Sequence, residues 1–323
     1  SGVAGSLALV ARQGDHAPGM PPDVALGYLN DPALNSSGNV VFQAQLVGSD
    51  FYYGHENSIW SNSSGSLDLI AGSGGDAPGT PPGVTFEWLG WDNRAVFNAA
   101  NRTAFTATIA GPSITALNDF GILSDVSGSL SMIARKSDPA PGAPSGVNFA
   151  GFSDPELNSF SRMTFVAYLS GGATDDTNNV SLWSDGRGQL KLIARTGNQP
   201  PETPHGTLYD DIGSYMINDS GQTAFASFLR GNAIHGGNNY GVWAEDKAGN
   251  LRLGVREGNQ IEVAPDDFRT VKSIEFACCT NGDGNPNAFN ALGGFAFRAG
   301  FTDGTQGVFI STIATIPEPS LSV

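Results

Sequence analysis

The run LALVAR at residues 7–12 decides the fold, because close copies of it return along the whole chain. The copies are LDLIAG from Leu67, LSMIAR from Leu130, LKLIAR from Leu190 and LRLGVR from Leu251. They begin about 60 residues apart. Self-similarity at a fixed period of this size indicates a repeat architecture in which one supersecondary unit is stacked many times.

Two further elements recur at the same period. The first is Asn-x-x-Gly followed by an alternating run that contains Phe, and its copies start at Asn35, Asn98, Asn158, Asn218 and Asn290. The second is a short apolar run centred on Trp60, Leu123, Trp183, Trp243 and Phe309. Five copies of each element predict five structural units.

Each unit contains four strand-like segments with alternating polarity, bounded by Gly, Asn, Ser and Pro. In the first unit these segments are 24–30, 39–47, 58–62 and 67–72, and the turn NSSGS at 62–66 joins the last two. Short turns of this kind connect antiparallel strands. An antiparallel meander of four strands repeated five times predicts an all-β, five-bladed β-propeller.

The two ends of the chain complement each other. Residues 7–12 resemble a fourth strand without the preceding three, whereas the last unit ends at 307–312 with a third strand and no fourth. We expect the N-terminal strand to pair beside the last blade and close the ring, which removes two free strand edges. The predicted domains are therefore one propeller over 1–314 and a tail over 315–323. An open β-solenoid is the structural alternative.

Composition excludes several partners. The formal net charge is −15, from 16 Lys plus Arg and 31 Asp plus Glu. Nucleic acids and anionic membrane surfaces are poor partners for such a chain. No apolar run approaches the roughly 20 residues that span a bilayer. Because the chain begins with Ser1, we expect an exported protein, extracellular or at the cell surface, whose signal peptide has been removed.

The repeat N-x-x-G-x-x-A/V-F resembles that of bacterial exported tandem-repeat proteins, which often carry a PEP-type C-terminal sorting region. The sequence Pro317-Glu318-Pro319 resembles the start of such a signal, without the hydrophobic helix and basic end that normally follow. The repeat departs from the pattern at Asn101 and Ser161, which replace Gly. The resemblance implies export and life at the surface or outside the cell, with no assigned reaction.

The recurring residues are interpreted as structural. Asn suits a turn in which its side chain bonds nearby backbone, and Gly suits positive φ. The Phe of each motif should pack between blades, and the Arg that recurs at the end of the fourth strand should pair with loop carboxylates or carbonyls. These residues are Phe42, Phe105, Phe165, Phe225 and Phe297, and Arg12, Arg135, Arg195 and Arg256.

Long loops gather on one face of the predicted propeller, which makes that face the candidate ligand surface. Its candidate residues are His16, Tyr52, Tyr53, His55, His235 and Tyr240. Trp88 and Trp91 could stack on sugar rings, but core packing is favoured for both. Acidic residues lie near the inner strands, at Asp31, Asp154, Glu156, Asp210 and Asp211. No repeat places a distinctive buried acid, so no catalytic residue is assigned.

The insertion that follows the first strand of the fifth unit contains further candidate site residues. Cys278 and Cys279 are adjacent and could form a vicinal disulfide, pair with another chain or stay as thiols. The oxygen-bearing residues that follow are weak candidates for calcium ligands, and a plain Asx-Gly loop is the favoured interpretation: Asn281, Asp283, Asn285 and Asn287. Their spacing departs from that of an EF-hand, and no other cofactor is expected. N-glycosylation sequons start at Asn35, Asn62, Asn101, Asn179 and Asn218.

The sequence leaves three functions open. The leading prediction is a non-enzymatic extracellular structural protein whose partners are copies of itself in a surface layer, tube or filament. Its C-terminal tail would anchor a neighbouring copy through Ile313, Ile316, Leu321 and Val323. The runner-up is a glycan-binding, lectin-like propeller at the cell surface, and a glycosidase is third.

Overall fold

The structure is a computed structural model that describes residues 7–48, 56–90, 95–277, 283–284 and 288–313. Every element in these ranges is a β-strand, and the strands form five antiparallel sheets, numbered here in chain order. No described helix is long and apolar enough to cross a membrane. The predicted all-β class and the meander within each unit are confirmed.

The strands follow the repeat. Sheet 1 contains β1 (Ala25–Leu29), β2 (Ala33–Leu34), β3 (Val40–Val47), β4 (Asn57–Ser61) and β5 (Asp68–Gly72). Sheet 2 contains β6 (Thr85–Leu89), β7 (Val96–Phe97), β8 (Thr103–Ala110), β9 (Phe120–Ser124) and β10 (Ser131–Arg135). Sheet 3 contains β11 (Asn148–Phe152), β12 (Glu156–Leu157), β13 (Met163–Ser170), β14 (Val180–Ser184) and β15 (Lys191–Arg195).

The last two sheets vary this scheme. Sheet 4 contains β16 (Leu208–Tyr209), β17 (Gly213–Ile217), β18 (Thr223–Arg230), β19 (Tyr240–Glu245) and β20 (Leu251–Arg256). Sheet 5 contains β21 (Gln260–Ala264), β22 (Asp267–Glu275), β23 (Phe295–Phe301) and β24 (Gln306–Ser311). In sheet 5 the strand order is β21-β22-β23-β24. Here β22, β23 and β24 correspond to the first, second and third strands of the other meanders, β21 is an extra strand before them, and no described strand follows β24.

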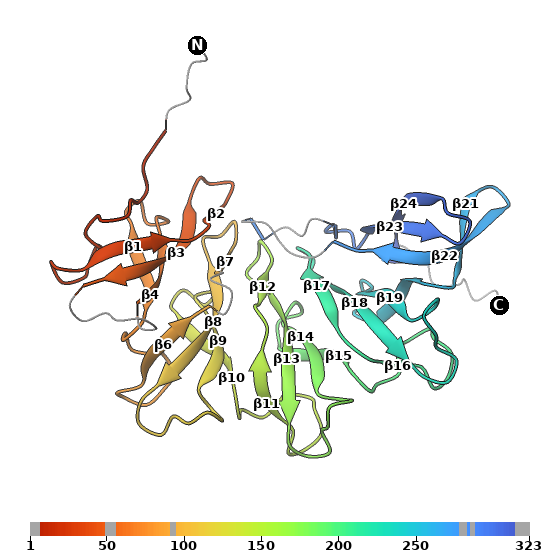
Figure 1. Ribbon diagram of the computed structural model, residues 1–323, viewed down its shortest axis with the longest axis horizontal. Helices are drawn as coiled ribbons and strands as arrows, with labels where there is room; N and C mark the ends of the chain where they lie inside the picture. The colour runs from red at the N-terminus through yellow and green to blue at the C-terminus, as the bar shows by residue number, and fades with distance from the viewer. Residues whose placement is uncertain (1–6, 49–55, 91–94, 278–282, 285–287, 314–323) are drawn as a thin grey trace, which may run out of the picture.

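The sheets are arranged as a fan (Figure 1). The ends that carry β2, β7, β12 and β17 converge, while the opposite ends splay apart. The Phe of each motif is buried, with exposures between 0% and 7%, as the sequence predicted. Apolar clusters join sheets 1 and 2, 2 and 3, 3 and 4, and 4 and 5. Packing between neighbouring sheets therefore holds the fan together.

The asparagine turns form a hydrogen-bonded ladder where the sheets converge. Each Asn oxygen accepts backbone N–H groups two or four residues later, as Asn158 does from Phe160 and Arg162. Each Asn nitrogen then donates to the carbonyl of the next Asn in the ladder. The bonds run from Asn35 to Asn98 (3.2 Å), from Asn98 to Asn158 (2.9 Å), from Asn158 to Asn218 (2.8 Å) and from Asn218 to Asn290 (2.8 Å). One side chain thus closes its own turn and ties two sheets together.

The fourth position of each turn has positive φ, as the sequence predicted for glycine. The values are 80° at Gly38, 72° at Gly221 and 84° at Gly293, and the replacing residues Asn101 and Ser161 take 60° and 63°. Asn adopts this conformation more readily than most residues because its short side chain bonds locally. The two departures from the glycine pattern therefore keep the turn.

The recurring arginines also have a structural role. The Nε atoms of Arg135, Arg195 and Arg256 donate to carbonyls of the loop before the third strand, over 2.6, 2.6 and 3.0 Å. The prediction that these arginines pair with loop carbonyls is confirmed. Arg12 instead pairs with Asp15 at 2.7 Å.

A second repeated device was not foreseen. At the end of the third strand of each meander (β4, β9, β14 and β19), a side-chain oxygen accepts a backbone N–H. The donor is the first residue of the second strand (β3, β8, β13 and β18), 22 residues earlier in the chain. The pairs are Asn62 with Val40, Asp125 with Thr103, Asp185 with Met163 and Glu245 with Thr223. Burial raises the pKa of the Asp125 and Asp185 carboxyl groups above the ordinary value of 3.8. These acids are part of the scaffold.

The closing contact differs from the prediction. Leu7–Arg12 is not a strand, and Leu7 and Leu9 are 97% and 74% exposed. The segment projects away from sheet 1, and β24 lies in sheet 5 at the other end of the fan (Figure 1). Among the described strands none pairs with the outer edge of β24, so the sheets do not form a closed ring.

Candidate functional site

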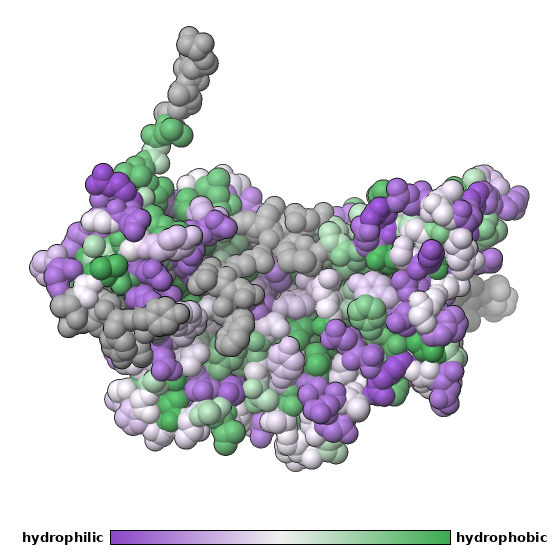
Figure 2. All heavy atoms as spheres, viewed as in Figure 1, coloured by the Kyte–Doolittle hydropathy of each residue, from purple (hydrophilic) through white to green (hydrophobic). Residues whose placement is uncertain are grey.

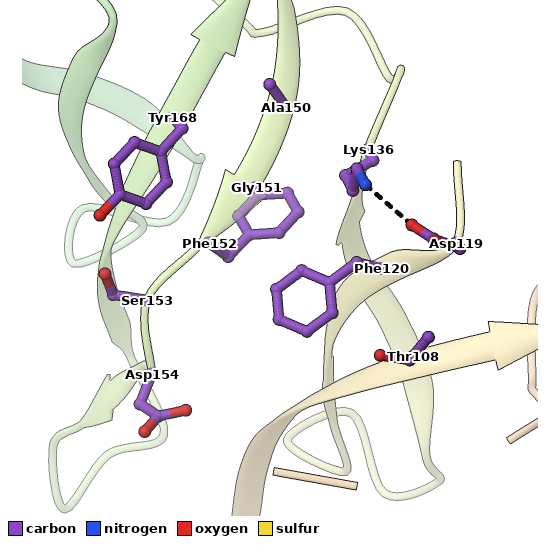
Figure 3. Close-up of a pocket in the computed structure, with 10 residues that line it drawn as sticks. All are labelled: Thr108, Asp119, Phe120, Lys136, Ala150, Gly151, Phe152, Ser153, Asp154 and Tyr168. Carbon is purple, nitrogen blue, oxygen red and sulfur yellow. Dashed lines mark hydrogen bonds and ion pairs between the residues drawn. The ribbon is translucent and has the colours of Figure 1, made fainter. Parts of the chain in front are cut away.

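A cavity of about 520 Å³ lies between sheets 2 and 3. Sheet 2 contributes β8, β9 and the residue after β10, and sheet 3 contributes β11, the chain after it and β13. The lining residues, drawn in Figure 3, are Thr108, Asp119, Phe120, Lys136, Ala150, Gly151, Phe152, Ser153, Asp154 and Tyr168. The cavity combines an aromatic wall with a few charged groups, which is the usual composition of a small-molecule site.

An ion pair borders the cavity on sheet 2. The Lys136 Nζ atom lies 2.8 Å from Asp119 Oδ1, and both side chains are half-buried. Asp119 directly precedes β9, and Lys136 follows β10, so adjacent strands hold the pair together. The pair offers donor and acceptor groups at one spot with little net charge.

Asp154 borders the cavity from sheet 3. The Thr106 hydroxyl of sheet 2 donates to Asp154 Oδ1 over 3.1 Å, and the Tyr215 hydroxyl of sheet 4 donates to the Asp154 backbone carbonyl over 2.5 Å. Asp154 is therefore bonded to sheet 2 through its carboxylate and to sheet 4 through its backbone carbonyl. Figure 3 shows Asp154 and Asp119 on different sides of the phenyl rings of Phe120 and Phe152.

The aromatic wall comes from both sheets. The ring centroids of Phe120 and Phe152 are 6.3 Å apart, with an interplanar angle of 32°. Tyr168, on β13, is 46% exposed. Aromatic faces carry partial negative charge, so they attract C–H groups and cations.

Gly151 contributes no side chain to the cavity lining. A register shift between Phe149 and Gly151 sets Gly151 opposite Tyr168. The same shift in sheet 2 sets Trp88 opposite Thr108. A Cβ atom added to Gly151 would meet its nearest neighbour at 3.5 Å, which is an ordinary contact. The cavity therefore lacks a side chain at the register position that Trp88 holds in sheet 2.

The ion pair is also absent from the equivalent positions in the other sheets. Equivalence follows from a shared bond, in which the N–H after the fourth strand donates to the carbonyl at the start of the third. The residues equivalent to Lys136 are Ser73, Thr196 and Glu257, and those equivalent to Asp119 are Glu56, Asn179 and Asn239. The lysine with its aspartate therefore occurs at one boundary of the described chain.

The predicted ligand face is not assembled at this cavity. The Nε2 atom of His16 bonds the carbonyls of Met20 and Pro21 within its own loop, and His235 contacts Asn238. Tyr240 packs against Phe228 with ring centroids 4.9 Å apart, and burial followed by the charge of Glu257 raises its pKa. Tyr52, Tyr53 and His55 lie outside the described residues.

The other predicted sites have mixed outcomes. Ile313 is 6% exposed and belongs to the cluster between sheets 4 and 5, so its prediction as an assembly anchor is wrong. Asn35 and Asn218 are 3% and 0% exposed and use their side-chain nitrogens in the ladder, which leaves no room for a glycan. Asn62, Asn101 and Asn179 are half-buried. The remaining tail anchors Ile316, Leu321 and Val323 and both cysteines lie outside the described residues.

The predicted calcium loop is described only at Asp283 and Gly284. The Asp283 carboxylate accepts the Ser36 N–H, and its backbone carbonyl accepts the Ala99 N–H over 3.1 Å. Asp283 thus bridges the turns of sheets 1 and 2. Asn281, Asn285 and Asn287 lie outside the described residues. Within the described ranges, no three His, Cys, Asp or Glu side chains are grouped so as to hold a metal ion.

A family model described as "Family of unknown function (DUF7453)" matches residues 1–323. No curated protein matches the chain. Solved structures resemble it weakly. An oligogalacturonate lyase in complex with manganese has a TM-score of 0.40 at 12% identity, over 92% of this chain and 67% of the other.

Two further structures give similar values. An oligogalacturonate lyase from Vibrio parahaemolyticus has a TM-score of 0.36 at 11% identity, over 90% of this chain and 79% of that one. An alpha-L-arabinofuranosidase from Fusarium graminearum, in complex with an iminosugar inhibitor, has a TM-score of 0.32 at 11% identity, over 91% and 83% of the two chains. At these values the names of the neighbours carry no argument about what this chain binds.

The prediction of a non-enzymatic structural subunit that assembles into a layer, tube or filament is corrected. Ile313, one of the anchors on which the assembly prediction rested, is 6% exposed and packs in the cluster between sheets 4 and 5.

Proposed function

The chain belongs over its whole length to the family of unknown function DUF7453. Because the family model gives no activity, we propose a function from the cavity itself: the protein binds a neutral saccharide between sheets 2 and 3. The observation that carries this proposal is a departure from the repeat. The Asn ladder, the third-strand oxygen and the buried Phe recur from sheet to sheet. Gly151, Lys136 and Asp119 do not, and all three meet at the cavity.

The chemistry of the lining favours a sugar ring. Sugars present apolar C–H faces, which stack on aromatic rings such as Phe120 and Tyr168. Their hydroxyl groups both donate and accept, and the cavity offers carboxylate acceptors at Asp119 and Asp154 beside the Lys136 ammonium donor. A volume of about 520 Å³ is ample for one or two sugar rings.

The charges of the cavity lining and of the whole chain favour a neutral ligand. The charged groups of the lining are two carboxylates, Asp119 and Asp154, and one ammonium group, Lys136, which lies 2.8 Å from Asp119. The whole chain also carries a net charge of −15. Sulfated, phosphorylated or uronic-acid ligands would meet repulsion at close range and at a distance.

Glycan-array screening, followed by calorimetric titration of the neutral oligosaccharides that bind, tests the proposal. Gly151→Trp places at the cavity the residue that the equivalent position of sheet 2 already holds, and should reduce affinity at least tenfold. Asp119→Asn with Lys136→Thr installs the residues of the next boundary and should also weaken binding. The matched control is Asn179→Asp with Thr196→Lys, which should leave affinity unchanged. Equal affinity in the Gly151→Trp variant would refute this cavity as the site.

Hydrolysis of a glycosidic bond is a second candidate, which one observation favours. Two carboxyl groups, Asp119 and Asp154, come from different sheets to the same cavity, and glycosidases use such a pair around the scissile bond. Release of reducing ends from oligosaccharides that bind, abolished in Asp154→Asn with binding retained, would establish this activity. Binding without release would leave the protein as a saccharide-binding protein.

A further inference from the structure

Four apolar clusters each join two neighbouring sheets, but a fifth is one-sided. The clusters between sheets 1 and 2, 2 and 3, 3 and 4, and 4 and 5 all contain residues from both partners. The fifth consists of sheet 1 and its entry loop alone, and it contains Leu26, Phe42 and Trp60. In sheets 2 and 3 the equivalent residues pack against the preceding sheet. Among the described residues no sheet precedes sheet 1.

Sheet 5 has the complementary feature on its outer face. In sheets 1 to 4 the residue before the central position of the third strand packs on the next sheet. These residues, Ile59, Ile122, Leu182 and Val242, are all 0% exposed. The equivalent residue of sheet 5 is Val308, which is 79% exposed, and its neighbour Ile310 is 71% exposed. This face therefore has the composition of a packed interface, and no described element covers it.

The outer edge of β24 also matches a segment of the same chain. In sheet 3 the fourth strand pairs Ala194 with Leu182 and Leu192 with Trp183. Leu7–Arg12 repeats this strand's sequence, and Figure 2 shows apolar side chains along its described part. In the register of sheet 3, Ala11 would lie opposite Val308 and Leu9 opposite Phe309.

Polar groups on the two faces match as well. Between sheets 2 and 3, Thr106 donates to Asp154, which lies four residues before the ladder asparagine of sheet 3. The equivalent of Thr106 in sheet 5 is Arg298, and the equivalent of Asp154 in sheet 1 is Asp31. Opposite charges thus stand at the two ends of the fan, where Arg298 now pairs with Glu275.

We propose that sheet 5 docks on sheet 1 of the same chain, that Leu7–Arg12 adds to the edge of β24, and that the fan closes into a ring. The path of the chain after residue 12 favours sheet 5 of the same chain, rather than that of a second copy, as the partner of sheet 1. The Gly14 N–H donates to the Leu26 carbonyl over 2.7 Å, as the equivalent loops of sheets 2 to 5 do, and Ala11 already packs on the core of sheet 1. Leu7–Arg12 therefore lies next to sheet 1 at the position that the fourth, outer strand of the preceding sheet takes next to sheets 2 to 5.

Disulfide cross-linking tests this register. In a Cys278→Ser, Cys279→Ser background, Ala11→Cys with Val308→Cys should form an intramolecular cross-link under mild oxidation, because paired strand residues lie within disulfide range. The control, Leu7→Cys with Val308→Cys, shifts one cysteine by about 13 Å along the strand and should react at least tenfold less. Circular dichroism of the reduced variants checks that each is folded. Absence of the first cross-link, or its formation only between two molecules, would overturn closure within one chain.

A charge exchange supplies a second measurement. Arg298→Glu should lower the yield of the Ala11–Val308 cross-link about tenfold, because two carboxylates would then face each other across the docked sheets. Adding Asp31→Arg should restore the yield. If Asp31→Arg does not rescue it, the two faces do not meet in the inferred arrangement, and the docking is refuted.

Discussion

The Asn98 side-chain nitrogen donates to the backbone carbonyl of Asn158 over 2.9 Å and so joins two turns that are 60 residues apart in the sequence. The Asn98 oxygen meanwhile accepts the N–H groups of Ala100 and Arg102. The short asparagine side chain accepts through its oxygen and donates through a separate nitrogen, whereas a carboxylate only accepts and a serine hydroxyl has one oxygen for both roles. This dual role explains why asparagine, rather than aspartate or serine, recurs at this position.

Asn98→Ala should cost about 2–4 kcal/mol in the free energy of unfolding, because it leaves buried turn N–H groups and the Asn158 carbonyl without their partner. Denaturant titration measures this cost. Asn98→Asp keeps the acceptor and loses the donor, so it should also destabilise. Asn118→Ala is the control, since its side chain bonds only within an exposed loop, and it should cost about 1 kcal/mol or less. An Asn98→Asp variant as stable as the parent would show that the ladder bond contributes nothing.

Gly221→Ala should destabilise the protein more than Gly38→Ala, although both glycines have the same place in their turns. Both have positive φ, which costs an alanine about 1–2 kcal/mol. A Cβ atom on Gly38 meets nothing within 4 Å, whereas one on Gly221 would clash with the Gly186 carbonyl oxygen. Thermal and denaturant unfolding should therefore give a loss of about 3 kcal/mol or more for Gly221→Ala. Equal losses would contradict the close approach of these two backbones.

Asp185→Asn should stabilise the protein at neutral pH. Burial raises the pKa of Asp185, against the opposing effects of the Met163 N–H and Arg162. The folded state therefore holds the proton more tightly than the unfolded state, so stability falls as pH rises from the ordinary value of 3.8 through the raised pKa. Asparagine keeps the acceptor for the Met163 N–H and removes this dependence, as Asn62 does in sheet 1.

The reciprocal change, Asn62→Asp, checks the same argument. It should lower the melting temperature at pH 7 and have a smaller effect near pH 4, where the new carboxyl group is protonated. Melting curves of both variants across this range test the sign. An Asp185→Asn variant that is less stable than the parent at pH 7 would mean that the charged form is favoured at this position.

Much of the scaffold was predictable because its devices are local and repeated. The Asn turns, the strands and the buried Phe follow from alternation and from the recurrence of the same residues at one period. The side-chain acceptors at the end of the third strand were not predicted, because the four residues, Asn62, Asp125, Asp185 and Glu245, differ in type. Their common role depends on strand pairing over 22 residues rather than on a shared motif.

The cavity was harder to predict. Lys136 departs visibly from Ser73, Thr196 and Glu257 once the repeats are aligned, and this was the available signal. Gly151 is different, because its equivalence to Trp88 depends on a register shift in the first strand of each sheet. The closing contact is a separate case: the repeated sequence predicts that residues 7–12 can pair like a fourth strand, but in this structure they are not paired with β24.

The last prediction concerns Tyr215, which lies outside the cavity lining and holds Asp154 through a hydrogen bond of 2.5 Å to the backbone carbonyl. Tyr215→Phe should weaken binding of the neutral saccharide about five-fold, which corresponds to about 1 kcal/mol for one lost bond that positions a ligand group. Calorimetric titration measures the change. Tyr209→Phe is the matched control, because the Tyr209 hydroxyl is buried without a hydrogen-bond partner in the described residues. It should leave affinity unchanged and keep or raise stability, since it removes an unpaired buried group. If both variants lower affinity equally, the effect comes from sheet 4 as a whole and Asp154 is not held for binding; if neither does, the position of Asp154 does not matter to the ligand.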